Sequence, residues 1–221
     1  IHTLACPTQL PDVITQASQV KNPDGSARFH TIIVDTITRL FDNYIAKFIS
    51  SNVPMYSMDS NGNMLTNLDY ISVTKAGKVD GMSGWQKMQN LWSAIQNAGN
   101  IGGVQMVYMS HMALNQMPDG TYKFVAPVSG GIGKAGLSSY FDVVVMATSV
   151  KMDDLNNEAD NPMLTKEESI PNTGFKHVFQ VGHTKDSQDY PLRVPTDIFD
   201  AHVRFIDNDL YTLNQYLEEA Y

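Results

Sequence analysis

The chain has 221 residues, of which 43% are apolar, so it can bury a single sizeable core that needs no disulfides or metal ions for its stability. Its 15 basic and 23 acidic residues give a net charge of −8, which excludes a protein that wraps a nucleic-acid duplex with its whole surface. Cys6 is the only cysteine, which excludes an intrachain disulfide and a cysteine-based zinc site. No apolar stretch approaches the roughly 18 residues that span a bilayer, so we expect a cytoplasmic protein with no membrane partner.

The first part of the chain predicts alternating strands and helices. Residues 1–6 are apolar enough for a strand, and residues 7–20 place apolar side chains at helical spacing. Residues 21–26 have the composition of a turn. The apolar run 29–35 then predicts a buried strand, and residues 36–52 predict a helix with one apolar stripe.

The periodicity fades after this helix. Residues 53–80 predict an irregular insertion, with a hairpin about the Asn-Gly pair at 61–62. Helical spacing returns over 83–98, and Gly99 is expected to end that helix. Residues 104–109 predict a second buried strand.

The second half of the chain predicts strands with little helix between them. In chain order we expect a turn at 116–120, an extended segment at 122–128, a glycine-rich loop at 129–136, a short helix at 137–140, strands at 141–150 and 175–183, and a closing helix at 210–221. The acidic segment 151–174 is expected to be a mobile loop. Continuous apolar strands favour a parallel sheet covered on both faces, and the later strands favour antiparallel additions at one edge. The predicted fold is α/β, with a mixed, mainly parallel sheet flanked by helices, in one core over residues 1–221.

The first candidate site residue is Asp35, which ends the strand over 29–35 and is followed by Thr36. A carboxylate at the carboxyl end of a central parallel strand lies in the crevice where open α/β sheets bind ligands. There it could hold magnesium through the waters that this ion retains. A second interpretation stays open, in which Asp35 caps the helix that begins near Thr36.

Ser110 and His111 stand at the end of the second apolar strand, so they are expected to open onto the same crevice as Asp35. A polar side chain there can sense a terminal phosphate or position the attacking water, and a histidine can donate a hydrogen bond to a phosphate oxygen. The alternative is an ordinary solvated or capped residue at a strand end.

The glycine-rich segment 129–136, which contains Lys134, at first suggests a phosphate loop. It does not match the pattern G-x-x-x-x-G-K-[ST], because Val128 stands at the first glycine position and Ala135 replaces the hydroxyl that binds magnesium. The pattern occurs nowhere in the 221 residues. The favoured interpretation is a flexible loop with one cation, of the kind that threads single-stranded nucleic acid.

A basic segment follows the strand over 175–183. It contains His183 and Lys185, and Arg193 lies shortly beyond it. Cations at a strand end can stabilise phosphoryl charge in their own subunit or in a neighbour's site. A solvated sheet edge is the alternative.

Taken in order, these segments resemble the ATPase core of RecA-like recombinases, most closely the small phage-encoded kind that acts in single-strand annealing and recombination. Residues 32–38 resemble the Walker B segment, and residues 107–111 resemble the strand that presents the nucleotide-sensing residue. Residues 127–141 are similar to the second DNA-binding loop and its exit. Residues 181–185 are similar to the segment whose basic residues contact ATP across a subunit interface. The resemblance covers roughly residues 1 to 200.

The resemblance implies a P-loop NTPase fold that binds ATP and Mg²⁺ between the subunits of a homo-oligomer. Asp35 and Thr36 would bind the nucleotide, with Asp35 holding the metal through water, and His111 would act as the phosphate sensor. His183 and Lys185 would contact the nucleotide as well. The contacts expected with single-stranded DNA are Lys123, Phe124 and Lys134. The cytoplasm of a phage-infected bacterium would be the fitting location.

One departure from the family limits what the resemblance implies. The phosphate loop and the helix behind it would precede Ile1, so either that unit lies upstream of this chain or the protein has lost it. The chain alone is therefore not expected to hydrolyse ATP, and an upstream loop would make it a DNA-dependent ATPase. The alternative is a catalytically silent RecA-like scaffold or interaction protein, which the acidic charge and the missing loop favour. A packaging or helicase motor would need the same loop, and no residue is named as a general base.

Overall fold

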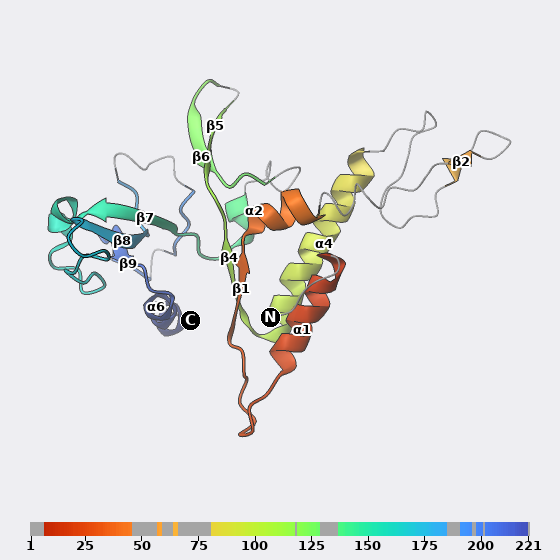
Figure 1. The fold of residues 1–221 in the computed structure, drawn as a ribbon, viewed down its shortest axis with the longest axis horizontal. Coiled ribbons are helices and arrows are strands. Elements are labelled where there is room, and N and C mark those ends of the chain that lie inside the picture. The colour runs from red at the N-terminus through yellow and green to blue at the C-terminus, as the bar shows by residue number, and fades with distance from the viewer. Residues whose placement is uncertain are drawn as a thin grey trace. The chain divides into compact units, whose positions relative to one another are not determined.

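The computed structural model describes residues 7–45, 57–58, 64–65, 81–117, 119–128, 137–184, 191–195, 198–200 and 202–220. The contacts divide the chain into two compact units: unit 1 consists of Ile1–Met112 and Ala126–Ala135, and unit 2 of Ala113–Val125 and Gly136–Tyr221. Figure 1 shows the helices and strands of both units. The chain is a mixed α/β protein with both parallel and antiparallel strand pairs.

Unit 1 begins with the helix that the sequence predicts. It consists of a 3-10 turn, η1 (Pro7–Gln9), and the helix α1 (Leu10–Gln19). The turn expected after it is confirmed by the isolated bridge between Lys21 and Ala27. Gly25 in this turn has φ +86°, a conformation that costs glycine little because it has no Cβ.

A parallel strand pair forms the sheet of unit 1. Strand β1 (Thr31–Asp35) pairs with β4 (Gln105–Met109) in a register that sets Asp35 beside Met109. The expected strands and their parallel pairing are confirmed. Burial on both faces is not, because Ile33 is 53% exposed and Met109 is 50% exposed. These two side chains lie on the same face of the pair, since residues two apart along a strand point to the same side.

The helix predicted over 36–52 begins at the expected place. The Thr36 hydroxyl accepts a hydrogen bond from the Arg39 amide at 3.2 Å and so caps α2 (Ile37–Arg39), which continues as the π-helical turn η2 (Leu40–Ile45). The apolar stripe is confirmed as far as the structure describes it, and its buried members are Ile37, Leu40, Phe41 and Ile45. Residues 46–52 lie outside the described residues, as do residues 1–6.

Helix α4 (Gly81–Gly102) is longer than the sequence predicts, and the prediction that Gly99 ends it is wrong. A Cβ at Gly99 would lie 2.4 Å from Cγ of Met106 in β4. Glycine stands here because the helix lies close against the strand, not because the helix ends. The chain leaves the helix at Gly103, where φ is +61°, the left-handed conformation that commonly follows a helix.

Trp92 of α4 lies at the centre of the unit 1 core. Its indole is 99% buried, and its ring centroid lies 5.2 Å from that of Phe41 and 5.2 Å from that of Tyr108. Tilted and edge-on aromatic pairs at this separation are favourable beyond the apolar area that they bury. One side chain of α4 therefore joins η2, which follows β1, to the strand β4.

Helices α1 and α4 run side by side, as Figure 1 shows. The two helices lie close together at Gly102, where an added Cβ would lie 2.6 Å from Cβ of Ser18. A Cβ atom is fixed to the backbone and cannot rotate away, so the two helices require a glycine at this contact.

Two hairpins complete the smaller elements. Strands β2 (Ser57–Met58) and β3 (Met64–Leu65) pair in antiparallel fashion, which confirms the hairpin expected about residues 61–62. The other residues of the insertion 53–80 lie outside the described residues. In unit 2, β5 (Ala113–Gln116) pairs with β6 (Tyr122–Val125). The sequence predicted an extended segment over 122–128 and missed β5.

Unit 2 contains a three-stranded antiparallel sheet in the order β7-β8-β9. Its strands are β7 (Met146–Lys151), β8 (Phe175–Gln180) and β9 (Phe205–Asp207), and the 3-10 turn η3 (Leu137–Tyr140) confirms the short helix expected before it. The strand predicted over 141–150 begins five residues late, and its exposure alternates along the chain instead of staying low. Among the described residues the antiparallel strands form sheets of their own, so the expected additions to the edge of the parallel sheet are not seen there.

Each face of this sheet carries its own small core. Phe179 and Ile206 pack with Leu213 of α6 (Leu210–Ala220), and the neighbouring residue Val178 packs on the opposite face with Leu155 and Leu164. Adjacent strand residues reach opposite faces because side chains alternate along a strand. The closing helix over 210–221 is confirmed.

The segment predicted as a loop over 151–174 contains the 3-10 helix η4 (Met152–Glu158), so the prediction needs correction there. Leu155, Glu158 and Leu164 are buried, which anchors the segment on the sheet. Whether the rest of it is mobile stays a prediction.

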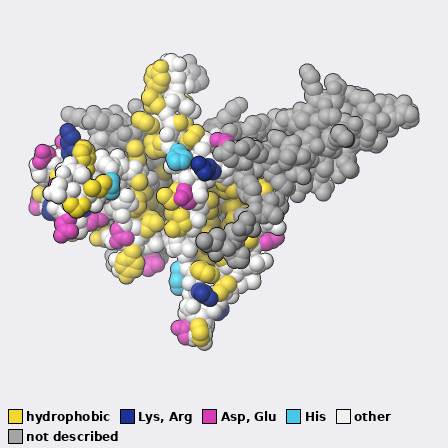
Figure 2. All heavy atoms as spheres, in the orientation of Figure 1, with side chains coloured by type: hydrophobic (Ala, Val, Ile, Leu, Met, Phe, Trp, Pro, Cys, Tyr) yellow, Lys and Arg dark blue, Asp and Glu magenta, His cyan; other side chains and the backbone are white. Residues whose placement is uncertain are grey.

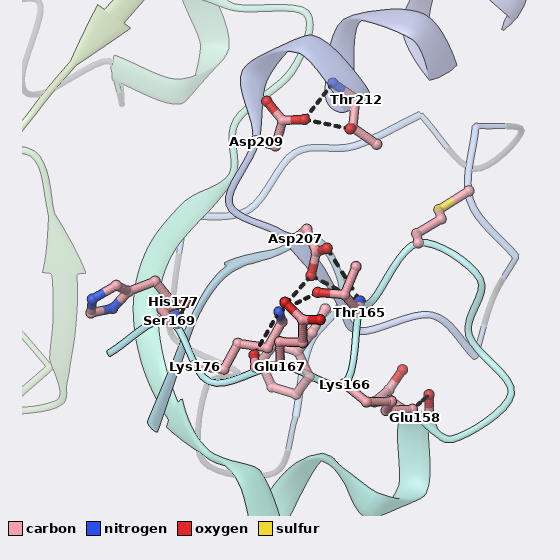
Figure 3. Close-up of polar contacts among 12 residues, drawn as sticks. Glu158, Thr165, Lys166, Glu167, Ser169, Lys176, His177, Asp207, Asp209 and Thr212 are labelled. Carbon is pink, nitrogen blue, oxygen red and sulfur yellow. Dashed lines mark hydrogen bonds and ion pairs between the residues drawn. The ribbon is translucent and has the colours of Figure 1, made fainter. Parts of the chain in front are cut away.

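A buried lysine ties this segment to β8 and β9, as Figure 3 shows. The Lys176 ammonium, whose side chain is 6% exposed, pairs with the Asp207 carboxylate at 3.0 Å. It donates its other hydrogen bonds to the Thr165 hydroxyl at 2.7 Å and to the Glu167 carbonyl at 3.1 Å. An ammonium has three donors, and all three are used. Asp207 also accepts from the Thr165 amide.

The contact at Gly102 predicts a compensating pair of substitutions. Gly102→Ala should destabilise the protein by about 1–3 kcal/mol through overpacking against Ser18. Ser18→Gly should cost about 0.5 kcal/mol from helix propensity, and it removes the Cβ that causes the clash. In urea unfolding, Gly102→Ala should therefore cost clearly less in the Ser18→Gly background. Equal costs in both backgrounds would show that the helices do not meet here.

The buried ion pair predicts that Asp207→Asn destabilises the protein by about 3 kcal/mol, because it leaves the Lys176 charge buried without its partner. The exposed acid Asp154 gives the matched control, and Asp154→Asn should change the free energy of unfolding by less than about 0.5 kcal/mol. Chemical denaturation of both variants measures the difference. If Asp207→Asn left the free energy of unfolding unchanged, Lys176 would have to be solvated.

Candidate functional site

The carboxyl ends of β1 and β4 bring the main predicted residues together in unit 1. Asp35 ends β1 beside Met109, the last residue of β4, and Ser110 and His111 follow directly. All three polar side chains are exposed, and the Asp35–Thr36 peptide bond is cis. Figure 2 shows a histidine, an acidic and a basic side chain close together over the region where β1 and β4 end beside α2. The strand register thus places Asp35 and His111 at the same edge of the sheet, as the sequence predicts.

The two interpretations of Asp35 can now be compared. The side chain that caps α2 belongs to Thr36, whose hydroxyl accepts from the Arg39 amide. The Asp35 carboxylate is therefore not the capping group and faces solvent. The Thr36 hydroxyl accepts this one hydrogen bond, and a hydroxyl group also has a proton to donate and a second lone pair, so the cap is compatible with its expected role at the nucleotide.

A chain of hydroxyl groups crosses from α2 to the end of β4. The Thr38 and Ser110 hydroxyl oxygens lie 3.1 Å apart, and Ser110 donates to the carbonyl oxygen of His111 at 2.9 Å. Sequence reasoning included Thr38 only in the segment that resembles Walker B and missed its contact with Ser110, because only the three-dimensional register of the two strands brings residues 38 and 110 together. It also passed over Arg39, an exposed cation in the last turn of α2.

The residues expected to contact DNA on the β5–β6 hairpin lie on opposite faces of that ribbon. Lys123 pairs with Asn115, and Phe124 pairs with Leu114 in the next register position. Side chains alternate along a strand, so Tyr122 shares the face of Phe124, and Lys123 does not. Tyr122 is 55% exposed, as is Leu114. Sequence reasoning missed Tyr122, although the period of two within an extended segment is the signal that would have found it.

The turn of this hairpin is held by an acid. The Thr121 hydroxyl and amide donate to the Asp119 carboxylate at 2.6 and 3.0 Å. These hydrogen bonds, first that of the hydroxyl, lower the pKa of Asp119 below its usual value. Gly120 has φ +83°, which fits a tight turn.

The predicted basic residues of unit 2 are placed only in part. His183 is exposed and follows Gly182, where a Cβ would lie 2.7 Å from the Val203 carbonyl oxygen, so a glycine is needed there. Arg193 forms an isolated bridge with Val144, and its guanidinium donates to the Ser139 carbonyl at 3.3 Å. Lys134 and Lys185 lie outside the described residues. His183 belongs to unit 2 and Asp35 to unit 1, so neither unit by itself joins the two.

A cross-strand pair in unit 2 also has the distance of a nucleophile and its base. The Ser149 hydroxyl lies 2.7 Å from Nδ1 of His177, at directly opposite positions of β7 and β8. Nucleophilic catalysis needs a third group that orients the histidine. The hydrogen bonds described for unit 2 give the His177 ring no carboxylate partner, so this pair does not form a triad.

Direct metal coordination has little support in the described part of the chain. No group of three or more His, Cys, Asp or Glu side chains there is arranged to hold a metal ion. In the same part of the chain, no helix is long and apolar enough to cross a membrane.

Comparison with protein-family models, with curated proteins and with solved structures found no match to this chain.

The aromatic core behind the site predicts a pH dependence of stability. Burial raises the pKa of Tyr108 from 10.0 to about 12. Below pH 10 the hydroxyl is neutral in both the folded and the unfolded chain. Between pH 10 and 12 it ionises first in the unfolded chain, so its contribution to stability is lost as the pH rises toward the folded pKa. Urea unfolding of wild type and Tyr108→Phe on both sides of pH 10 should show a smaller loss in the variant. If the free energy of unfolding changed with pH equally in the two proteins, the raised pKa of Tyr108 would be contradicted.

Proposed function

We propose that this chain is a RecA-like nucleotide-binding protein of phage-type DNA recombination, which binds ATP with Mg²⁺ and single-stranded DNA in a homo-oligomer. The observation that carries the proposal is the juxtaposition of Asp35 with Ser110 and His111 at the carboxyl ends of two parallel, adjacent strands. Open α/β sheets bind ligands at this edge, and an acid beside a hydrogen-bond donor is what a magnesium–phosphate group requires.

Within this proposal each residue has a separate role. The exposed Asp35 carboxylate holds magnesium through water, and the ion neutralises phosphate charge when it is bound. His111 donates to the terminal phosphate and stands only two positions before β5, the first strand of the hairpin. A change at the phosphate would therefore reach the hairpin through a very short segment of chain.

The hairpin is the proposed contact for single-stranded DNA. Tyr122 and Phe124 share one face, where bases can stack on an aromatic ring whatever their sequence. Lys123 lies on the other face and is available for the phosphate backbone. Lys134 is part of the same proposal from the sequence alone.

The homo-oligomer is proposed because the basic segment with His183 and Lys185 would reach the nucleotide of a neighbouring subunit. ATP hydrolysis further requires a phosphate loop, which these 221 residues do not contain. With that loop supplied upstream, the protein would be a DNA-dependent ATPase in the cytoplasm of an infected bacterium.

A second candidate function is a catalytically silent RecA-like scaffold that uses the fold for protein contacts only. Two observations favour it: the phosphate-loop pattern is absent from the chain, and the net charge is −8. The two candidates differ in a simple property, because a scaffold has no reason to bind a nucleotide or an oligonucleotide.

Asp35→Asn tests the proposed function, in the complete natural reading frame. Because the variant loses the charge that holds the metal's water, Mg-ATP affinity should fall about 10- to 100-fold, as is typical when an outer ligand is lost. Asp12→Asn changes an exposed acid in the first turn of α1 and serves as the control that should leave the affinity unchanged. Equilibrium titration with a fluorescent ATP analogue and Mg²⁺ measures both.

Filter binding with single-stranded DNA supplies the second arm. If Mg-ATP increases the amount of oligonucleotide that the protein retains on the filter, the result supports the proposed role in recombination. If the wild-type protein retains no DNA with or without ATP, the recombinase proposal fails and the scaffold stands.

A further inference from the structure

The hydroxyl chain between α2 and β4 has a definite direction. Ser110 has one hydroxyl proton, and it donates that proton to the His111 carbonyl at 2.9 Å. The 3.1 Å contact between the Thr38 and Ser110 hydroxyls can then be a hydrogen bond only if Thr38 is the donor. The chain therefore runs from Thr38 through Ser110 to the backbone of His111.

This chain connects the two segments that the proposed function uses. Thr38 lies in the helix that Thr36 caps, three positions after Asp35, which is proposed to hold the metal through water. Ser110 and His111 begin the segment that leads from β4 into the hairpin, since β5 starts at Ala113. Both contacts lie at the exposed edge of the sheet, where a hydrogen bond adds little to stability. A purely structural role would therefore leave the pair nearly dispensable.

We infer that Thr38 and Ser110 are positioning residues that couple Mg-nucleotide binding at Asp35 to DNA binding by the β5–β6 hairpin. The inference rests on the proposed function and adds to it a route between the two sites. Nucleotide binding fixes the end of β1 and the start of α2, and the Thr38 hydroxyl then fixes Ser110. Ser110 in turn fixes the His111 carbonyl and, with it, the start of the segment that enters the hairpin.

The test measures coupling instead of affinity alone. The dissociation constant for a fluorescent oligothymidine is determined by anisotropy with and without Mg-ATP, in the complete natural reading frame, and the ratio of the two constants is the coupling. Thr38→Val removes the donor while keeping the shape, and it should reduce the ratio about fivefold, the factor that one neutral hydrogen bond typically controls. Thr38→Ser keeps the donor and should retain the wild-type ratio.

Thr15→Val is the matched control, because the Thr15 hydroxyl also donates a helical hydrogen bond, to the Pro11 carbonyl at 2.9 Å, but lies in α1. It should leave the ratio unchanged. Ser110→Ala breaks both links of the chain, so adding Thr38→Val to it should have no further effect. This variant also gives an independent reading if Thr38→Val does not fold.

The outcomes separate the two proposals. If wild type binds both ligands with coupling, and Thr38→Val and Ser110→Ala keep the wild-type ratio, the inference is wrong and the proposed function stands. An equal loss in Thr15→Val also overturns the inference, since any lost hydroxyl would then act alike. If wild type binds neither Mg-ATP nor the oligonucleotide, the proposed function fails and the inference falls with it.

Discussion

The packing of Trp92 is the constraint on which the candidate site depends. This side chain comes from α4, the helix that crosses over between the two parallel strands, and it contacts Phe41 after β1 and Tyr108 within β4. One buried ring of this helix therefore contacts both the strand β4 and the turn η2 that follows β1 and α2. The register of two parallel strands decides which of their residues lie side by side at the edge of the sheet. Here it sets Asp35 beside Met109. The polar residues that follow each strand meet because an apolar contact behind the sheet aligns them.

The local sequence pattern was enough to predict the helices and strands whose apolar side chains form one continuous stripe. The helix over 7–20 and the start of the helix at Thr36 follow from apolar spacing, and the strands of the parallel pair follow from unbroken apolar runs. Gly99 was read wrongly because glycine serves two purposes, helix termination and close packing, and only the contact with Met106 distinguishes them. Strands as short as β9 carry too few residues for a pattern to emerge.

The candidate site was predictable only where a residue stands at the end of its own strand. Asp35 and His111 could be placed at one edge because parallel strands end on the same side. The contact between Thr38 and Ser110 spans 72 positions and depends on the register, which no local pattern contains. The separation of Lys123 from Phe124 was in principle visible, since adjacent residues in a ribbon always face opposite ways.

The net charge of −8 also bears on the proposed binding of an oligonucleotide. Affinity that comes from phosphate contacts falls steeply with salt, and its slope grows with the number of phosphates neutralised. The hairpin offers one lysine on one face and two aromatic rings on the other, so stacking would supply more of its affinity than charge. A single-stranded partner is the form of nucleic acid that exposes its bases for stacking, whereas a duplex buries them. The acidic balance of the chain and the aromatic face of the hairpin are therefore both compatible with the single-stranded DNA partner that we propose.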